Sequence, residues 1–348
     1  MPENAVEGNI VSMRLVAVML LPLSLLTLAP DAARTKAPPE LQKFLRGVVG
    51  STDADIAAVE NGQVISRLLP ETDKGEVAAF GIVRVTASAD RLQTLALDVK
   101  SYRSMEGVAQ LNLFSDPPAP GDCDALVIPD QDIDAIRNCK SGACDVKITD
   151  DMLASVSRID WTAPGARDKV MHEFREMVVK VASGFRSEGI DGLGVIVDKK
   201  DPKPRALEFQ KLLANSPYLY EYMKDFHTYL AEYPKGRYPG AKSMLYWTKE
   251  TFGPKPVIAI NCQTVASRGE TVMIANQMVA ASHYFNAGLD ICVGVPATSG
   301  GGMYMVDVYR VRIDPPTGAL AGPTTGKIRG GIKGGVQKVL MGLASKLK

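Results

Sequence analysis

The sequence predicts an α+β fold, in which a curved antiparallel sheet packs against one long C-terminal helix. Three observations predict it. A buried strand pattern occupies residues 76 to 86, and a series of strand patterns follows from residue 243 to residue 313. Helical patterns fill residues 164 to 235 between these two regions. An amphipathic pattern over residues 326 to 347 predicts the closing helix.

The first third of the chain alternates between helix and strand patterns. Apolar residues recur at helical spacing from residue 38 onward, and residues 64 to 69 form a short strand pattern. Ser88 follows the strand pattern of residues 76 to 86. Its hydroxyl is suited to accept a hydrogen bond from the first turn of a helix, so we expect a helix to begin there. Partial alternation over residues 108 to 114 predicts the next strand.

The late strand patterns are long, and Gly-, Pro- or Ser-rich breaks separate them. They occupy residues 244 to 249, 257 to 265, 271 to 284, 286 to 295 and 303 to 313. Successive strands joined by short connections favour a meandering antiparallel sheet.

Tyrosines are concentrated at the end of the central helical segment. They are Tyr218, Tyr220, Tyr222, Tyr229, Tyr233 and Tyr238. Such a group is more typical of helix packing than of a ligand site, because the rings supply large apolar surfaces. A docking face for a protein partner is the alternative interpretation of residues 218 to 238.

The closing helix is basic and rich in glycine. Its cations are Lys327, Arg329, Lys333, Lys338, Lys346 and Lys348, and no acidic residue follows Asp314. A basic amphipathic helix is suited to rest on an anionic membrane, but a solvated cationic face is an equally good interpretation. Each glycine inside a helix costs about 1 kcal/mol relative to alanine. Close packing on the sheet or mobility of a lid would explain these glycines.

An early strand and helix, later antiparallel strands and a long final helix occur in this order in the helix-grip fold. Residues 77 to 102 and 257 to 348 resemble the START/polyketide-cyclase superfamily, which has this fold. Residues 164 to 235 would then be a helical insertion in a single domain over residues 34 to 348. The whole chain also resembles an uncharacterised family of exported bacterial proteins. The segments that carry this second resemblance are residues 114 to 118, 139 to 144, 246 to 250 and 281 to 287.

The helix-grip resemblance implies an apolar cavity between the sheet and the last helix that holds a lipid or a similar molecule. The candidate ligand-binding residues are His283, Tyr284, Met273, Met278, Met303, Tyr246 and Trp247. Methionine is suited to such a lining because its side chain is flexible and polarisable. The alternative is that the methionines simply fill the core and that His283 is a hydrogen-bonded interior histidine.

The motifs of common enzymes are absent from the sequence. No G-x-S-x-G elbow is present, and Ser282 and His283 are adjacent, so they would face opposite sides of a strand. The carboxylates between Asp122 and Asp134 lack the spacing of a calcium loop, and the glycines at residues 300 to 302 lack a Walker lysine. We therefore predict no catalytic residue, no metal and no cofactor.

The N-terminus has the pattern of a cleavable secretory signal, which we place at residues 1 to 33, and we expect the true start to be Met13. An uncharged apolar run covers residues 15 to 29. A signal core needs about 7–15 apolar residues, whereas a membrane-spanning helix needs about 20. An uncleaved membrane anchor is the alternative. The prediction is therefore a periplasmic or secreted protein.

Five cysteines gain importance if the chain folds in an oxidising compartment. Cys139 and Cys144 flank a short segment with Gly142, which allows the chain to turn and the two thiols to form a disulfide. Free thiols and, less favourably, a zinc site are the alternatives for this cluster, which includes Cys123. Cys262 and Cys292 lie in strand patterns and are typical of small buried residues.

These patterns together predict an exported, non-catalytic protein that binds or transfers a hydrophobic, lipid-like molecule. Residues 326 to 348 are the candidate membrane contact. A formal net charge of +1 predicts no general affinity for nucleic acid. One alternative is an enzyme that uses the same cavity, with His283 and either Tyr284 or Tyr246 as acid and base. Another is a structural or partner-binding protein of the cell envelope.

Overall fold

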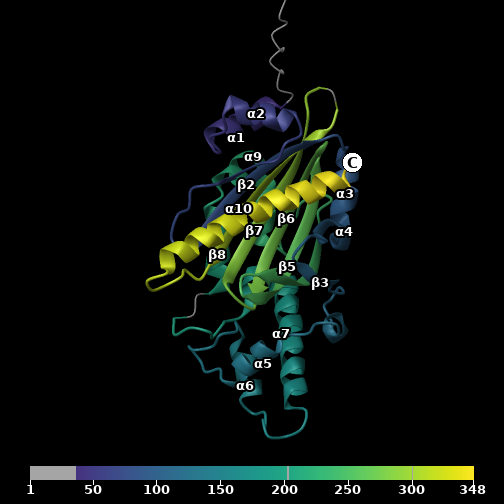
Figure 1. The fold of residues 1–348 in the computed structure, drawn as a ribbon. Helices are drawn as coiled ribbons and strands as arrows, with labels where there is room; N and C mark the ends of the chain where they lie inside the picture. The colour runs from purple at the N-terminus through teal and green to yellow at the C-terminus, as the bar shows by residue number, and fades with distance from the viewer. Residues whose placement is uncertain (1–36, 202–203, 300) are drawn as a thin grey trace, which may run out of the picture. The chain divides into compact units, whose positions relative to one another are not determined.

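Eight strands form a single open antiparallel sheet in the order β1-β2-β8-β7-β6-β5-β4-β3 (Figure 1). The computed structural model describes residues 37–201, 204–299 and 301–348. The strands are β1 (Ile65–Leu68), β2 (Glu76–Val85), β3 (Val108–Leu113), β4 (Lys242–Phe252), β5 (Lys255–Arg268), β6 (Thr271–Ala281), β7 (Phe285–Pro296) and β8 (Met303–Ile313). The α+β class and the antiparallel pairing are confirmed.

The late strands form a meander because each one turns back directly beside its predecessor. β4 to β8 pair in sequence order, and β2 adds to the far side of β8. The connection from β2 to β3 carries the chain to the other edge of the sheet, and after the long β3–β4 connection the chain re-enters the sheet directly beside β3. Side chains along each strand alternate between two faces, and each face carries its own apolar cluster.

The C-terminal helix α10 (Ala321–Lys346) runs across one face of the sheet (Figure 1). Ile332, Val336, Leu340 and Leu343 form its buried stripe, as the helical spacing predicts. The helices α3 (Ala89–Leu97) and α4 (Val99–Arg103) also belong to this side, where Leu92 of α3 approaches Gly294 of β7.

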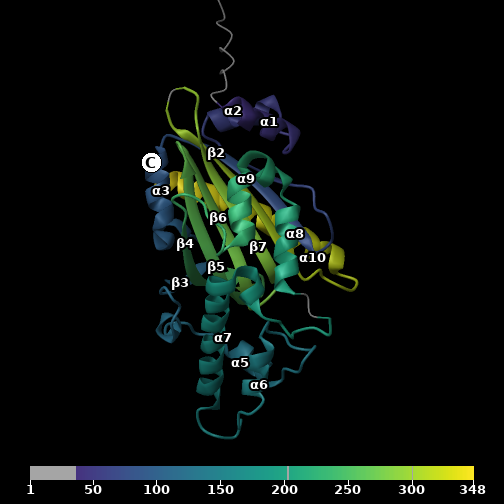
Figure 2. The ribbon, with the colours of Figure 1, turned by 180° about the vertical axis from the view of Figure 1, so that it is seen from behind.

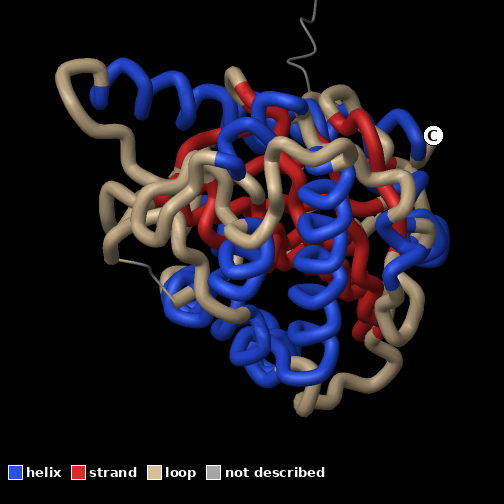
Figure 3. The backbone as a smooth tube through the Cα atoms, turned by 90° about the horizontal axis from the view of Figure 1, so that it is seen from below, coloured by secondary structure: helices blue, strands red, loops and turns tan. Residues whose placement is uncertain are grey.

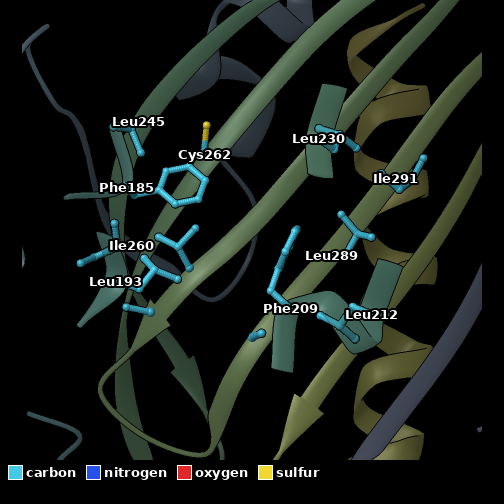
Figure 4. Close-up of a cluster of buried hydrophobic side chains, with 14 of the residues drawn as sticks. Phe185, Leu193, Phe209, Leu212, Leu230, Leu245, Ile260, Cys262, Leu289 and Ile291 are labelled. Carbon is cyan, nitrogen blue, oxygen red and sulfur yellow. The ribbon is translucent and has the colours of Figure 1, made fainter. Parts of the chain in front are cut away.

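A second group of helices lies on the opposite side of the sheet, as Figure 2 shows from behind. They are α7 (Ala166–Glu188), the 3-10 helix η2 (Gly189–Leu193), α8 (Arg205–Ala214) and α9 (Pro217–Glu232). Phe185 and Phe209 project from α7 and α8 toward Ile260, Leu289 and other apolar side chains of the strands (Figure 4). Figure 3 shows the strands between these helices and α10. The protein therefore has a sheet with a helical layer on each face.

The remaining elements are short. They are α1 (Pro39–Gly47), α2 (Asp53–Glu60), the 3-10 helix η1 (Pro120–Cys123), α5 (Asp130–Arg137) and α6 (Asp150–Val156). The predicted helical segment of residues 164 to 235 contains α7, η2, α8 and α9, but the helical part of the β3–β4 connection already begins at η1. The acidic segment from Asp130 to Arg137 and the candidate capping residue Asp150 predict short helices there, and α5 and α6 confirm them.

The predicted Cys139–Cys144 disulfide is present, with Cα atoms 4.6 Å apart. Cys123, Cys262 and Cys292 are free and buried. Burial raises the pKa of the Cys123 and Cys262 thiols to about 12, so both remain protonated and unreactive at neutral pH. The predicted signal segment at residues 1 to 33 lies outside the described residues.

Candidate functional site

A cavity of about 870 Å³ lies between α10 and the sheet. Strands β4 to β8 contribute its floor, and residues 103–108, from the last residue of α4 to the first of β3, form one side. The middle of α10, from Gly331 to Gly342, forms the other side. Three segments that are distant in the sequence thus enclose one space.

Glycines of α10 leave room for this cavity. Gly331, Gly334, Gly335 and Gly342 all line it. A Cβ atom added at Gly335 would have no atom within 4 Å, so any larger residue there would project into open space. The glycines that cost helix stability in the sequence therefore keep one flank of the helix bare above the cavity.

Part of the cavity lining is apolar. Phe252, Met278 and Phe285 contribute from β4, β6 and β7, and Ile332 and Val339 contribute from α10. Phe252 and Phe285 also contact each other, with ring centroids 4.7 Å apart. These side chains provide an apolar surface for a hydrocarbon or aromatic body.

A buried arginine lies at the inner, polar end of the cavity. Arg103 Nε donates to Gln263 Oε1 at 2.8 Å, and its Nη1 donates to Asp290 Oδ2 at 2.8 Å. The guanidinium also lies over the Tyr102 ring, 5.0 Å from its centroid. Gln263 is held in turn, because its Nε2 donates to the carbonyl of Ala96 at 2.6 Å. Arg103 is thus fixed in place before any ligand binds.

Two carboxyl groups interact beside Arg103. Asp290 on β7 pairs with Tyr309, whereas Asp307 on β8 pairs with Cys292, so the two aspartates are diagonal neighbours on the cavity face. Burial raises the pKa of Asp307 well above its usual range. The charge of Asp290 and a hydrogen bond with its carboxylate raise that pKa further, while Arg103 lowers it. Asp307 therefore holds a proton that ordinary aspartates lose.

Both aspartates also have an oxygen without a hydrogen bond. Oδ1 of Asp290 and Oδ1 of Asp307 are buried and have no partner among the described residues. An unsatisfied buried oxygen costs about 1–3 kcal/mol, and the proton held by Asp307 offsets part of this cost where it joins the two carboxyl groups.

A chain of amides extends the polar floor toward β4. Tyr246 Oη donates to Asn276 Oδ1 at 2.7 Å, and Asn276 Nδ2 donates to Asn261 Oδ1 at 3.3 Å. Glu250, on the same face of β4, accepts a hydrogen bond from Thr248 Oγ1 at 2.7 Å. Burial is the largest cause of a raised pKa at Tyr246, so its hydroxyl stays protonated and acts as a donor.

Only two of the predicted ligand-binding residues line this cavity, Tyr246 and Met278. Trp247 and Met273 belong to the cluster on the opposite face, because neighbouring strand residues point to opposite sides. The Trp247 indole donates to the carbonyl of Asp122 at 2.9 Å. Met303 faces the α10 side, but it packs near Leu92 of α3 beyond the cavity.

His283 and Tyr284 lie in the turn between β6 and β7, and neither lines the cavity. Nδ1 of His283 lies 3.0 Å from the carbonyl oxygen of Asp145, and Nε2 lies 3.0 Å from Asp132 Oδ2. Because His283 is only 4% exposed, this arrangement matches the alternative of a hydrogen-bonded interior histidine.

The polar residues Arg103, Glu250, Asp290 and Asp307 were not among the predicted site residues. One of them carries a signal in the sequence, since Asp290 is the single charged residue of β7, whereas β8 contains Arg310 and Arg312 besides Asp307. An ionisable residue in a buried strand needs a partner or a function. Arg103 is the last residue of the short helix α4, and no local pattern distinguishes it from a surface arginine.

The tyrosine-rich region is mostly interior. Tyr229 and Tyr233 stack near Phe226 and Phe185, and Tyr218 contacts Phe44. Tyr220 of α9 is an exception among these tyrosines, because it is 49% exposed. This placement favours packing over a docking face.

Several cations of α10 are held by the protein itself. Arg329 pairs with Glu71 at 3.1 Å, Lys338 pairs with Glu106 at 2.9 Å, and Lys346 donates to the carbonyls of Ser101 and Ser104. Across the described ranges, no helix has both the length and the apolar character needed to cross a bilayer.

Comparison with known proteins found no match, whether with protein-family models, curated proteins or solved structures.

Proposed function

We propose that this protein binds a small amphipathic molecule in the cavity between α10 and the sheet, in the manner of a helix-grip protein. The cavity itself is the observation that carries the proposal. Its volume of about 870 Å³ falls within the range of roughly 300–1,000 Å³ that is typical of small-molecule sites.

The lining supports an amphipathic ligand more than a purely hydrophobic one. Phe252, Met278 and Val339 offer an apolar wall, whereas Arg103 and Asp290 occupy the inner end. A hydrocarbon placed against that end would cover charged groups without giving them new hydrogen bonds, which is unfavourable. A ligand with a polar end would satisfy them.

The proposal includes export to an oxidising compartment, which the Cys139–Cys144 disulfide and the signal-like N-terminal sequence support. No observation favours the enzyme alternative based on His283, because that residue lies outside the cavity. Transfer of the ligand to a membrane by way of residues 326 to 348 stays a prediction.

The test uses two leucine substitutions on opposite flanks of α10. Gly335→Leu would fill the cavity, whereas Gly330→Leu is a matched control, because Gly330 does not line the cavity and a Cβ there meets no atom within 4 Å. Both changes replace a helical glycine, so both should raise helix stability.

Native mass spectrometry of the gently purified proteins should show a bound small molecule in the unmodified chain and in the control variant Gly330→Leu. The same adduct should be absent from Gly335→Leu. An adduct that persists in Gly335→Leu would contradict binding in this cavity. The proposal would also be contradicted if none of the three proteins carried an adduct or bound an amphiphile that was added to it.

A further inference from the structure

We propose that the ligand carries a primary amine, and that its ammonium group binds at the inner end of the cavity beside Asp290 and Asp307. This inference rests on the proposed function and specifies the class of ligand. The carboxyl groups that line the cavity outnumber the cations that line it.

Four carboxyl groups and two cations line the cavity. Lys338 pairs with Glu106 at the rim, where the side chains are 67% and 80% exposed, so these two charges neutralise each other. The inner part then contains Arg103 and three carboxyl groups, those of Glu250, Asp290 and Asp307. A cationic group is the missing complement.

Arg103 cannot serve as that complement for all three carboxyl groups. Its Nε and Nη1 already donate to Gln263 and Asp290. Oδ1 of Asp307, which has no partner besides the carboxyl group of Asp290 among the described residues, belongs to a residue that is only 2% exposed and lines the cavity. A carboxylate-bearing ligand would add a fourth acid to this end, whereas an ammonium supplies three N–H donors.

Tyr246 and Tyr309 link the carboxyl groups into one site. Burial is the largest cause of the raised pKa of Tyr309, and the charges of Glu250 and Asp290 raise it further. The same two charges also raise the pKa of Tyr246. These four side chains therefore lie within electrostatic range of one another at the same end of the cavity.

Binding of a cation here couples to the proton of Asp307. The groups that face Asp307 are Asp290 and Cys292 on β7 and Tyr102 and Arg103 on α4, and Tyr309 follows two residues along β8. An ammonium near Asp290 would offset the repulsion that keeps the Asp307 proton in place. Binding of the amine therefore releases up to one proton, and its affinity increases with pH.

The first experiment compares three ligands of equal chain length by calorimetry: octylamine, octanol and octanoate. The amine should bind about tenfold more tightly than either of the others, which corresponds to one charge-assisted hydrogen bond. Measurements in buffers with different ionisation enthalpies should show proton release with octylamine and none with octanol. A primary amine stays protonated to about pH 10, so the released proton comes from the protein.

The second experiment uses Asp307→Asn, which has the same shape but no ionisable proton. Octylamine binding to this variant should lose its proton release and its increase with pH, while octanol binding confirms that the cavity is intact. Asp134→Asn is the matched control, because Asp134 is exposed on α5 and paired with Arg167. It should behave like the unmodified protein.

The outcomes separate the two proposals. If none of the three ligands binds, the proposed function is contradicted together with this inference. If octanol or octanoate binds as tightly as octylamine, or if proton release persists in Asp307→Asn, the cavity still binds amphiphiles but the assignment to amines is wrong.

Discussion

Gly81 of β2 lies directly beneath Val336 of α10. A Cβ atom at Gly81 would come within 2.6 Å of Val336 Cγ1 and of Leu340 Cδ1, so only a glycine fits under the helix at this point. The contact holds one flank of α10 against the sheet. The other flank, with Gly335 and Val339, lies over the cavity. The height of the helix above the sheet therefore depends on this contact.

Gly81→Ala should destabilise the protein by about 1–3 kcal/mol, because the added methyl group overlaps two packed side chains and forces α10 away from β2. Urea unfolding measures the change. Gly330→Ala is the control with the opposite sign, since a Cβ there meets nothing and alanine favours the helix by up to about 1 kcal/mol. Equal stability of Gly81→Ala and the unmodified protein would contradict the close packing.

The Cys139–Cys144 disulfide should contribute about 2 kcal/mol to stability, because it closes a short loop of sequence separation 5 in the unfolded chain. Replacement of both cysteines by serine should lower the free energy of unfolding by that amount. Alkylation and mass measurement check the pairing: the denatured protein should add three labels without reductant, for Cys123, Cys262 and Cys292, and five after reduction. Five labels without reductant would exclude the disulfide.

The late half of the fold is predictable because its strands are long and its turns are clear. Residues 303 to 313 were predicted as a strand and form β8 with these bounds, and α10 was predicted within five residues of its start. Parts of the region from η1 to α6 are predictable as well. The acidic segment from Asp130 to Arg137 predicts a helix turn, and Asp150 is suited to cap the next helix; α5 and α6 confirm both helices.

The candidate site is only partly predictable, because the sheet separates residues that are adjacent in sequence. Tyr246 and Trp247 were grouped together, yet one lines the cavity and the other packs on the opposite face. The choice of face follows from the alternation along the strand, which the sequence does show. The meeting of Arg103 with Asp290 does not follow from any local pattern, since 187 residues separate them.

His283 and Asp132 should stabilise the fold together. Nδ1 of His283 donates to a carbonyl, and its Nε2 shares a hydrogen bond with Asp132, so Asp132→Ala leaves a buried ring nitrogen without a partner. The expected cost is about 1–3 kcal/mol. Asp134→Ala, on the same helix but exposed, should cost less than about 1 kcal/mol. A double-mutant cycle with His283→Ala measures the coupling, and a coupling of zero would show that the pair contributes nothing.

Glu208 of α8 should be important for stability because it neutralises Arg312 of β8. Arg312 Nε lies 2.9 Å from Glu208 Oε2, and both side chains are 2% exposed. Glu208→Ala leaves a buried guanidinium undercompensated and should cost about 3 kcal/mol. Lys211, which pairs with the same carboxylate, is 49% exposed, so Lys211→Ala should cost less than about 1 kcal/mol. Urea unfolding measures both changes, and a similar loss of unfolding free energy in the two variants would argue against a stabilising Glu208–Arg312 pair.

Asp307 should make the protein less stable as pH rises. An unfolded aspartate has a pKa of about 3.9, whereas burial and the neighbouring Asp290 raise the pKa of Asp307 in the folded chain. Between these two values the folded state binds more protons than the unfolded state, so the stability contributed by this group is complete below about pH 4 and decreases as pH rises toward the folded pKa.

Asp307→Asn removes this dependence. The stability of the variant relative to the unmodified protein should therefore increase as the pH rises above about 4, by at most about 1.4 kcal/mol per pH unit. Urea unfolding at several pH values measures the difference. Asp134→Asn should show no such trend, because its carboxyl group is exposed and lies far from Asp290 in the fold, on α5 rather than on the sheet. A constant difference between Asp307→Asn and the unmodified protein would mean that Asp307 is ionised in the folded state, with Arg103 outweighing its burial.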